Sequence, residues 1–190
     1  MRVSLVNKIA LELVAVFVVC YAVRMNKMPS IGSEQEKQTP VITQRPATPD
    51  DFEFARKTHH EGYRNVVEKQ FGNWDEKRQD EFFAAAWAAS PHEILFCDNE
   101  PCGYLSTEET PDAVELHELV LLPPFQGRGI GQKLLQKAID TAKETGKSAR
   151  LQVLKENLAA ELYRRLGFKE VGETDTHLKM EYNPSNQAIL

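Results

Sequence analysis

The sequence has little cysteine, no excess of basic charge and no hydrophobic run of full membrane length. Only three cysteines occur among 190 residues, and no two of them have the C-x-x-C spacing of a metal site. Cys97 and Cys102 flank a predicted turn at 98–101, so a disulfide between two strands is conceivable. We expect two reduced thiols instead, and no bound metal.

The charge balance is acidic rather than basic. Lysine and arginine number 23 against 28 aspartates and glutamates, which leaves a formal net charge of -5. A nucleic-acid surface needs basic residues that displace counterions, so we expect no nucleic-acid partner. A cationic substrate suits this balance better. The hydrophobic fraction of 42% is ordinary for one domain with one core.

The main apolar stretch, residues 9–23, is short for a membrane span. About 20 apolar residues cross a bilayer, and Glu12 interrupts this run. It can serve as a signal-anchor helix if Leu5 and Val6 are included. Alternatively it is a surplus extension, because Met28 is a second candidate start, and a cleaved signal peptide is a third, less favoured interpretation. We therefore divide the chain into a hydrophobic segment at 1–27, a linker at 28–40 and a folded domain at 41–185.

The order of predicted elements indicates an α+β (mixed α/β) domain with helices on the faces of one sheet. Strands are expected near 41–43, 94–96, 103–105, 113–122, 149–154, 171 and 177–182. Helices are expected at 50–62, at 63–71, from about 75 to 89, from the glycines to about 144, and at 157–166. Gly62 is interpreted as a helix end, and His59 and His60 as a solvated helix surface.

A glycine-rich stretch follows the longest predicted strand, and it reads F-Q-G-R-G-I-G over residues 125–131. A Walker A loop needs Lys-Ser or Lys-Thr after its last glycine, and a dinucleotide loop needs G-x-G-x-x-G, so both interpretations fail. The stretch still lies between a strand end and a helix start, where free N–H groups and the helix dipole favour an anion. Its glycines remove side chains that would block the approach, and Arg128 adds a positive charge.

These residues resemble the signature Q/R-x-x-G-x-G/A of the GNAT superfamily of acetyl-CoA-dependent N-acetyltransferases. Gln126 to Gly131 match it in full, and the stretch from Leu151 to Phe168 is similar to the family's L-x-V-L-x-x-N…L-Y-x-x-L-G-F pattern. The resemblance covers roughly residues 41–182. It implies a mostly antiparallel sheet that is splayed between its fourth and fifth strands, and transfer of acetyl from acetyl-CoA to an amine without an acyl-enzyme.

The resemblance also implies where the coenzyme lies. Its pantetheine arm would pair with the backbone of Leu119, Val120 and Leu121, and its pyrophosphate would contact the loop. The implied loop ligands are Gln126, Gly127, Arg128, Gly129, Ile130 and Gly131. Asn157 is one residue out of the family's spacing to Tyr163, so it is either a coenzyme ligand or a helix N-cap.

Three residues are candidates for the proton transfers that amine acetylation needs. Glu115 is the candidate base, because its distance before Gln126 matches the catalytic glutamate of the superfamily's histone acetyltransferases. His117 is a second base or a relay. Regular strand alternation puts both on one face with Leu119 and Leu121, and puts Glu118 on the other. By the resemblance, Tyr163 would protonate the departing thiolate.

The acceptor stays open at this point. The leading hypothesis is a primary amine of a small molecule or a protein, and the protein version includes Nα- and Nε-acetyltransferases. A non-catalytic acyl-CoA sensor on the same fold is the alternative from a different class. We expect a cytoplasmic catalytic domain, with a membrane tether through residues 9–23 if residues 1–27 are retained, and a homodimer is compatible with the sequence.

Overall fold

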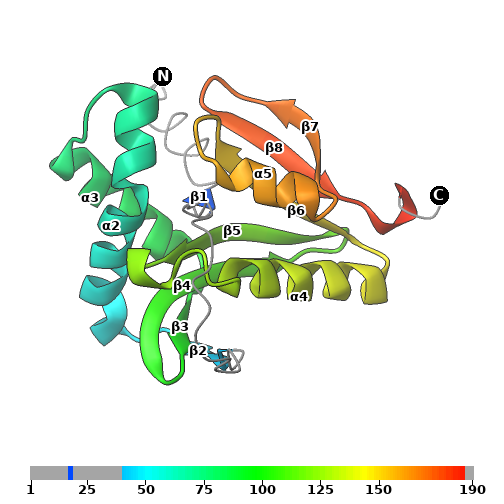
Figure 1. Ribbon diagram of the computed structural model, residues 1–190, viewed down its shortest axis with the longest axis horizontal. Coiled ribbons are helices and arrows are strands. Elements are labelled where there is room, and N and C mark those ends of the chain that lie inside the picture. Colours follow the sequence, from blue (N-terminus) through cyan, green and yellow to red (C-terminus); the bar gives the residue numbers. More distant parts are fainter. Residues whose placement is uncertain (1–16, 19–39, 187–190) are drawn as a thin grey trace, which may run out of the picture.

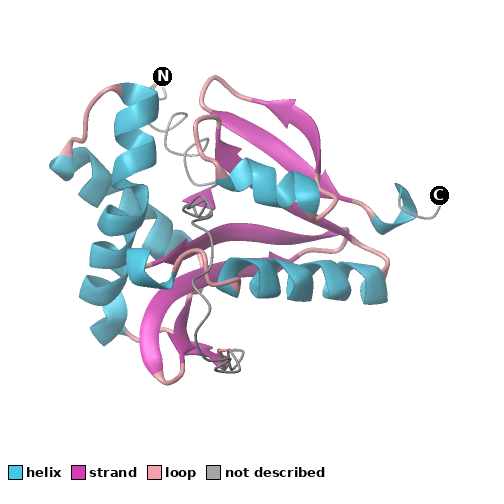
Figure 2. Cartoon of the chain, in the orientation of Figure 1, coloured by secondary structure: helices cyan, strands magenta, loops and turns pink. Residues whose placement is uncertain are grey.

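The computed structural model describes residues 17–18 and 40–186, and this part of the chain forms one sheet with helices on both faces (Figures 1 and 2). The strands are β1 (Phe17–Val18), β2 (Ile42–Pro46), β3 (Glu93–Cys97), β4 (Glu100–Glu109), β5 (Ala113–Leu121), β6 (Ser148–Leu154), β7 (Lys169–Glu173) and β8 (His177–Tyr182). The helices are α2 (Phe52–Phe71), α3 (Glu76–Ala89), α4 (Ile130–Thr145) and α5 (Ala159–Arg165). The predicted fold class is confirmed.

The sheet order is β2-β3-β4-β5-β6-β8-β7, and β1 joins β5. Neighbours along this order are antiparallel except β5 and β6, which are parallel. Helix α4 makes the crossover that a parallel pair requires. The register of β5 and β6 ends at Leu116 and Leu151, although both strands continue beyond it. The fourth and fifth strands of the folded domain therefore diverge, as the resemblance implied.

Two hydrophobic clusters lie on opposite faces of the sheet. The larger contains Leu116, Leu119 and Leu121 of β5 together with residues of α4 and α5. The smaller contains Val120 of β5 with residues of α2 and α3, among them Phe83. We call these the α4 side and the α2 side. The β5 strand takes part in both, which explains why seven of its nine residues are buried.

The helix α2 runs without interruption through Gly62, so the predicted break at Gly62 is wrong. A Cβ on Gly62 would lie 2.6 Å from Cγ1 of Val120. The glycine therefore allows close packing of α2 on β5 rather than ending the helix. The α2 helix ends at Gly72, which has a left-handed φ of 84°.

Most of the apolar stretch 9–23 lies outside the described residues. Its Phe17–Val18 forms β1, which pairs in parallel with Glu118 and Leu119 of β5. Figure 1 shows this short strand beside β5, in the space where β5 leaves β6. Within residues 40–186, none of the helices is long and apolar enough to cross a membrane.

Candidate functional site

The glycine loop connects the end of β5 to the start of α4. A 3-10 turn at Pro123–Phe125 stops the strand, and Gln126 Nε2 then donates to the carbonyl oxygen of Leu121 at 2.8 Å. Gly127 and Gly129 have φ angles of 70° and 80°, a region that other residues rarely adopt. The loop thus folds back on the strand and presents the first turn of α4 at the strand end.

Among the described residues, none covers the Cβ positions of Gly129 and Gly131 at the first turn of α4, and this turn has no side-chain cap. Gly129 is the N-cap and lacks a capping side chain, and the first backbone bond of the helix runs from Lys133 N–H to Gly129 oxygen at 3.1 Å. A Cβ on Gly129 or Gly131 would meet no described atom within 4 Å. Uncapped N–H groups, open space and the helix dipole together suit an anion such as a pyrophosphate.

Arg128 is exposed in this loop, and its guanidinium lies over the Phe125 ring at 5.4 Å from the centroid. The aromatic ring holds the positive charge near the helix start. Ile130, in contrast, is buried in the α4-side cluster. Among the predicted loop ligands, Arg128 therefore supplies a charge, while Ile130 can offer only its backbone N–H.

The backbone of β5 beyond Leu116 is the second part of the site. The side chains of Leu119, Val120 and Leu121 are buried in the core, so their main-chain groups are what this strand edge can offer a ligand. Phe17–Val18 already pairs with Glu118 and Leu119 there. The edge is consequently able to accept an added strand, which is the pairing that the resemblance implies for a pantetheine arm.

The three predicted proton-transfer residues have different surroundings in the structure. Glu115 lies where β5 and β6 are still paired, and its carboxylate forms an ion pair with Arg150 at 3.6 Å. His117 bonds through Nε2 to the Glu108 carboxylate at 3.1 Å. Tyr163 is fully buried in the α4-side cluster.

A β-bulge changes the predicted faces of β5. The register to β4 shifts between Ser106 and Thr107, so that Ser106 faces Glu118 and Thr107 faces Leu116. His117 is the extra residue, and alternation restarts after it. Leu119 consequently shares the α4 side with Leu116, and the predicted common face for Glu115 and Leu119 is wrong.

Asn157 lies at the start of α5, where its Oδ1 accepts from the backbone N–H of Ala159 at 2.9 Å. The side chain is buried, and this bond satisfies one of the free donors of the helix start. The N-cap position of α5 is Leu158, so Asn157 stands one residue before the N-cap position that the sequence suggested for it. Tyr163 follows on the same helix, and its ring meets Phe168 edge-on at 6.0 Å between centroids.

A buried pair of ionisable residues, Glu118 and His92, was not predicted from the sequence. Glu118 Oε2 and His92 Nε2 are 2.9 Å apart, and the two side chains are 4% and 2% exposed. Burial raises the pKa of Glu118 although the hydrogen bond to His92 opposes that shift. The only signal in the sequence was an acid within a strand, and that strand also contains Glu115 and His117.

The adjacent histidines of α2 are buried, so their predicted solvated position is wrong. His60 bridges α2 to α3 through Glu76 at 2.8 Å and Asp80 at 3.0 Å. His59 packs against Tyr63 and Phe83, and burial lowers its pKa to about 3. Both residues hold α2 against α3.

Within the described residues, no group of three or more histidine, cysteine or acidic side chains could hold a metal ion.

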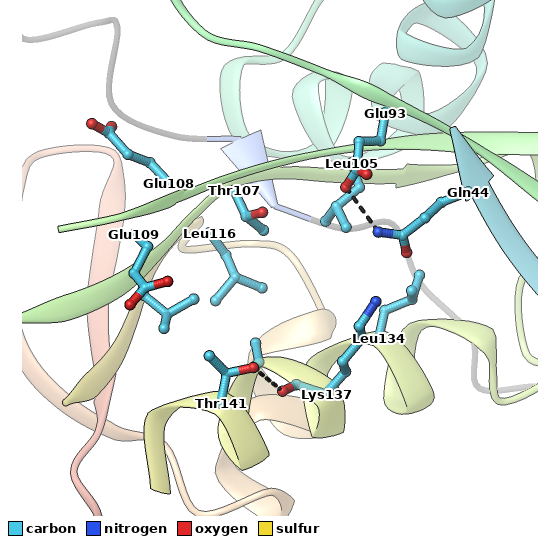
Figure 3. A pocket seen from close by; sticks show the side chains of 12 residues that line it. Gln44, Glu93, Leu105, Thr107, Glu108, Glu109, Leu116, Leu134, Lys137 and Thr141 are labelled. Atoms are coloured by element: carbon cyan, nitrogen blue, oxygen red, sulfur yellow. Dashed lines mark hydrogen bonds between the residues drawn. The ribbon is translucent and has the colours of Figure 1, made fainter. Parts of the chain in front are cut away.

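A separate pocket of about 170 Å³ lies on the α4 side, between β4, β5 and α4 (Figure 3). Glu93 borders it and accepts a hydrogen bond from Gln44 Nε2 at 2.9 Å, and Lys137 and Thr141 border it from α4. None of the predicted site residues lines it. Cys97 and Cys102 are buried free thiols.

Comparison with known proteins places this architecture among acetyltransferases. Residues 54–168 match the model of the Acetyltransferase (GNAT) family. An uncharacterized N-acetyltransferase of Methanocaldococcus jannaschii is 34% identical over 140 residues, which cover 67% of this chain and 61% of that protein. A [ribosomal protein bS18]-alanine N-acetyltransferase of Haemophilus influenzae is 36% identical over 78 residues, or 40% of this chain and 53% of that one. The match thus spans less than two thirds of the length of each of these two relatives.

Solved structures show the same fold. The PaiA N-acetyltransferase from Thermoplasma acidophilum, solved in complex with coenzyme A, superposes with a TM-score of 0.61 at 21% identity, over 75% of this chain and 99% of that one. The fold, the glycine loop at the end of β5 and the match over 54–168 agree with one another. This chain therefore belongs to the GNAT family of acetyltransferases.

Proposed function

We propose that this protein transfers the acetyl group of acetyl-CoA to a primary amine. One observation carries the proposal: β5 leaves β6 after Leu116, and the same strand then leads directly into an uncapped, glycine-lined helix start. A strand edge and an anion site in continuous order suit a ligand that joins an amide-bearing arm to a pyrophosphate. Leu119 to Leu121 would bind the arm through their backbone, and Gln126 to Gly131 the pyrophosphate.

The reaction forms a C–N bond and breaks the C–S bond of the thioester. The acceptor must first lose a proton, because an ammonium nitrogen has no lone pair for attack. The neutral amine then adds to the carbonyl carbon, and the departing thiolate gains a proton. Glu115 and His117 stay our proposals for the base from the family pattern, and Tyr163 stays our proposal for the acid.

A protein N-terminus is the acceptor that we favour among primary amines. The support is the relative from Haemophilus influenzae, whose name assigns it to an alanine of a ribosomal protein. An α-amine has an ordinary pKa near 8, so a smaller share of it needs deprotonation at neutral pH than for a lysine amine. Peptides that begin with alanine therefore belong in any acceptor panel.

A turnover screen tests the proposal directly. Purified full chain is mixed with acetyl-CoA and single amines, and the free thiol released is measured. The panel holds peptides with free N-terminal alanine, the same peptides with a blocked N-terminus, lysine peptides, polyamines and amino acids. Thiol release with at least one primary amine supports transfer. Binding of acetyl-CoA without turnover on the whole panel would instead support the acyl-CoA sensor.

A further inference from the structure

His117 lies at the point where β5 leaves β6. The last pair between these two strands joins Leu116 to Leu151, and His117 is the next residue along β5. It is also the extra residue of the β-bulge opposite Ser106 and Thr107. A bulge takes a side chain out of regular alternation, and bulges are common beside functional sites. The side chain of His117 is 23% exposed, so it remains accessible to solvent.

The order of the proposed coenzyme site decides which part of β5 the thioester reaches. The pyrophosphate is placed on the loop 126–131, which follows β5, and the arm on the backbone of residues 119–121. An arm that leaves the loop along this strand edge runs back toward the start of β5. It must stop where β6 takes up the same edge, at the pair of Leu116 and Leu151. If the proposed function holds, the thioester therefore lies at the level of His117.

Glu108 of the neighbouring strand β4 holds the ring of His117. Glu108 Oε2 and His117 Nε2 are 3.1 Å apart. An ionised carboxylate can only accept a hydrogen bond, so a neutral imidazole in this contact carries its proton on Nε2. Nδ1 then keeps its lone pair, and it bonds to none of the residues that the structure describes. The contact thus selects the tautomer in which Nδ1 can take a proton.

The two acids beside His117 on β5 are already engaged. The carboxylate of Glu115 pairs with Arg150 at 3.6 Å, and a guanidinium makes a carboxylate a weaker base because it stabilises the ionised form. The side chain of Glu118 is only 4% exposed, and its carboxylate contacts His92 at 2.9 Å. His117 therefore combines access to solvent with a nitrogen lone pair that no neighbouring cation neutralises.

We propose that His117 is the base that deprotonates the acceptor amine, and that Glu108 is its positioning residue. This inference rests on the proposed acetyl transfer. Nδ1 of His117 takes one proton from the ammonium group, which frees the nitrogen lone pair to attack the thioester carbon. The C–N bond forms and the C–S bond breaks. The nitrogen then loses a second proton, which balances the proton that the departing thiolate takes up.

The cycle closes on the tautomer with which it began. Nε2 of His117 keeps its proton and its bond to Glu108 throughout, and only Nδ1 gains and loses a proton. The carboxylate of Glu108 stabilises the imidazolium while it exists, to an extent that water limits because this side chain is 61% exposed. Nδ1 then releases its proton to water, so one proton is freed for each acetyl group transferred.

The test measures the turnover of His117→Ala, Glu108→Ala and the double variant in the full chain, on an amine that the turnover screen identifies. We expect H117A to lower kcat by roughly 100- to 10,000-fold. Imidazole added to H117A should restore part of this rate, above the rate without protein and in proportion to its concentration, because it supplies the missing base.

Glu109→Ala is the matched control for Glu108. Glu109 is the next residue of β4, its side chain is 55% exposed, and it pairs with Lys147 instead of a histidine. Figure 3 shows the side chains of Glu108 and Glu109 pointing away from each other. E109A should keep the wild-type kcat, and a loss in E109A equal to that in E108A would overturn the role of Glu108.

The double variant separates positioning from a structural effect. We expect E108A to lower kcat by roughly 3- to 30-fold, with KM for the amine and Kd for acetyl-CoA nearly unchanged. In the H117A background the same substitution should have no further effect, because Glu108 then has no ring to orient. An equal loss from E108A in both backgrounds would show that Glu108 acts without His117, and would overturn the inference.

The remaining outcomes distinguish this inference from the proposed function. Wild-type turnover with an unaltered kcat in H117A would overturn the inference and leave the proposed function in place. Absence of wild-type turnover on the whole panel would overturn both. Should H117A fail to fold, His117→Gln takes its place, because it keeps a polar side chain at the bulge. A wild-type kcat in folded H117Q would equally overturn the inference.

Discussion

Gly131 offers a way to separate coenzyme binding from stability. It is the second residue of α4, its φ is not in the left-handed region, and a Cβ there would meet no described atom within 4 Å. Although Gly131 is buried, neither its backbone nor its Cβ position opposes a side chain in Gly131→Leu. Leucine is the better helix former by about 0.5–1 kcal/mol, so the free energy of unfolding should rise slightly. Gly129 is less suitable, since its φ of 80° would strain any substituent.

The same leucine should weaken acetyl-CoA binding. Its side chain would occupy the space above the N–H groups of the first turn, where we place the pyrophosphate. A hydrogen bond to a charged group contributes about 1.5–3 kcal/mol, and about 1.4 kcal/mol corresponds to a tenfold change in Kd. Losing one such bond therefore raises Kd by roughly 10- to 100-fold. Gly131→Ala should bind nearly normally, because the family signature accepts alanine at this position.

Gly146, at the other end of α4, supplies the matched control. Its φ is 71°, and a Cβ would again meet no described atom within 4 Å. Gly146→Ala should lower the free energy of unfolding by about 1–2 kcal/mol through backbone strain, yet leave Kd unchanged. Isothermal titration with acetyl-CoA and urea unfolding measure the two quantities. A wild-type Kd for G131L would refute the placement of the pyrophosphate on this helix start.

Three further predictions concern packing, pH and the N-terminal strand. Gly62→Ala should lower the free energy of unfolding by about 1 kcal/mol, because its Cβ would lie 2.6 Å from Val120. In a Val120→Ala background the same substitution should raise the free energy of unfolding. Urea unfolding measures both changes, and a change of the same sign in both backgrounds would contradict the contact. Burial lowers the pKa of His59 from 6.5 to about 3 in the folded protein. The fold should therefore lose on the order of 4 kcal/mol as the pH falls from 6.5 toward 3, because the unfolded chain binds a proton there that the buried imidazole does not. His59→Gln should flatten the stability profile in that window, and parallel profiles would argue against it. Val18→Pro removes a backbone donor of β1, so acetyl-CoA should bind more tightly if Phe17–Val18 and pantetheine use the same edge; an unchanged Kd in titration would exclude that competition.

The sequence by itself determined the family and the glycine loop on which the proposed coenzyme site rests. The spacing of Gln126, Gly127, Gly129 and Gly131 is local, and local chemistry decides what a strand–loop–helix turn can bind. The helix ends at Gly72 and Gly146 were also predictable from local sequence, because glycine adopts a left-handed φ without the steric cost of a side chain.

Only the tertiary structure decided which side chains share a face or a pocket. A bulge at His117 depends on how β4 pairs with β5, and one extra residue moves every later side chain to the other face. It put Glu118 against His92, which lies 26 residues away, and left Glu115 with Arg150. Gly62 looked like a helix end because the sequence does not show that Val120 packs there. Contacts between distant segments are set by packing, and packing depends on the whole fold.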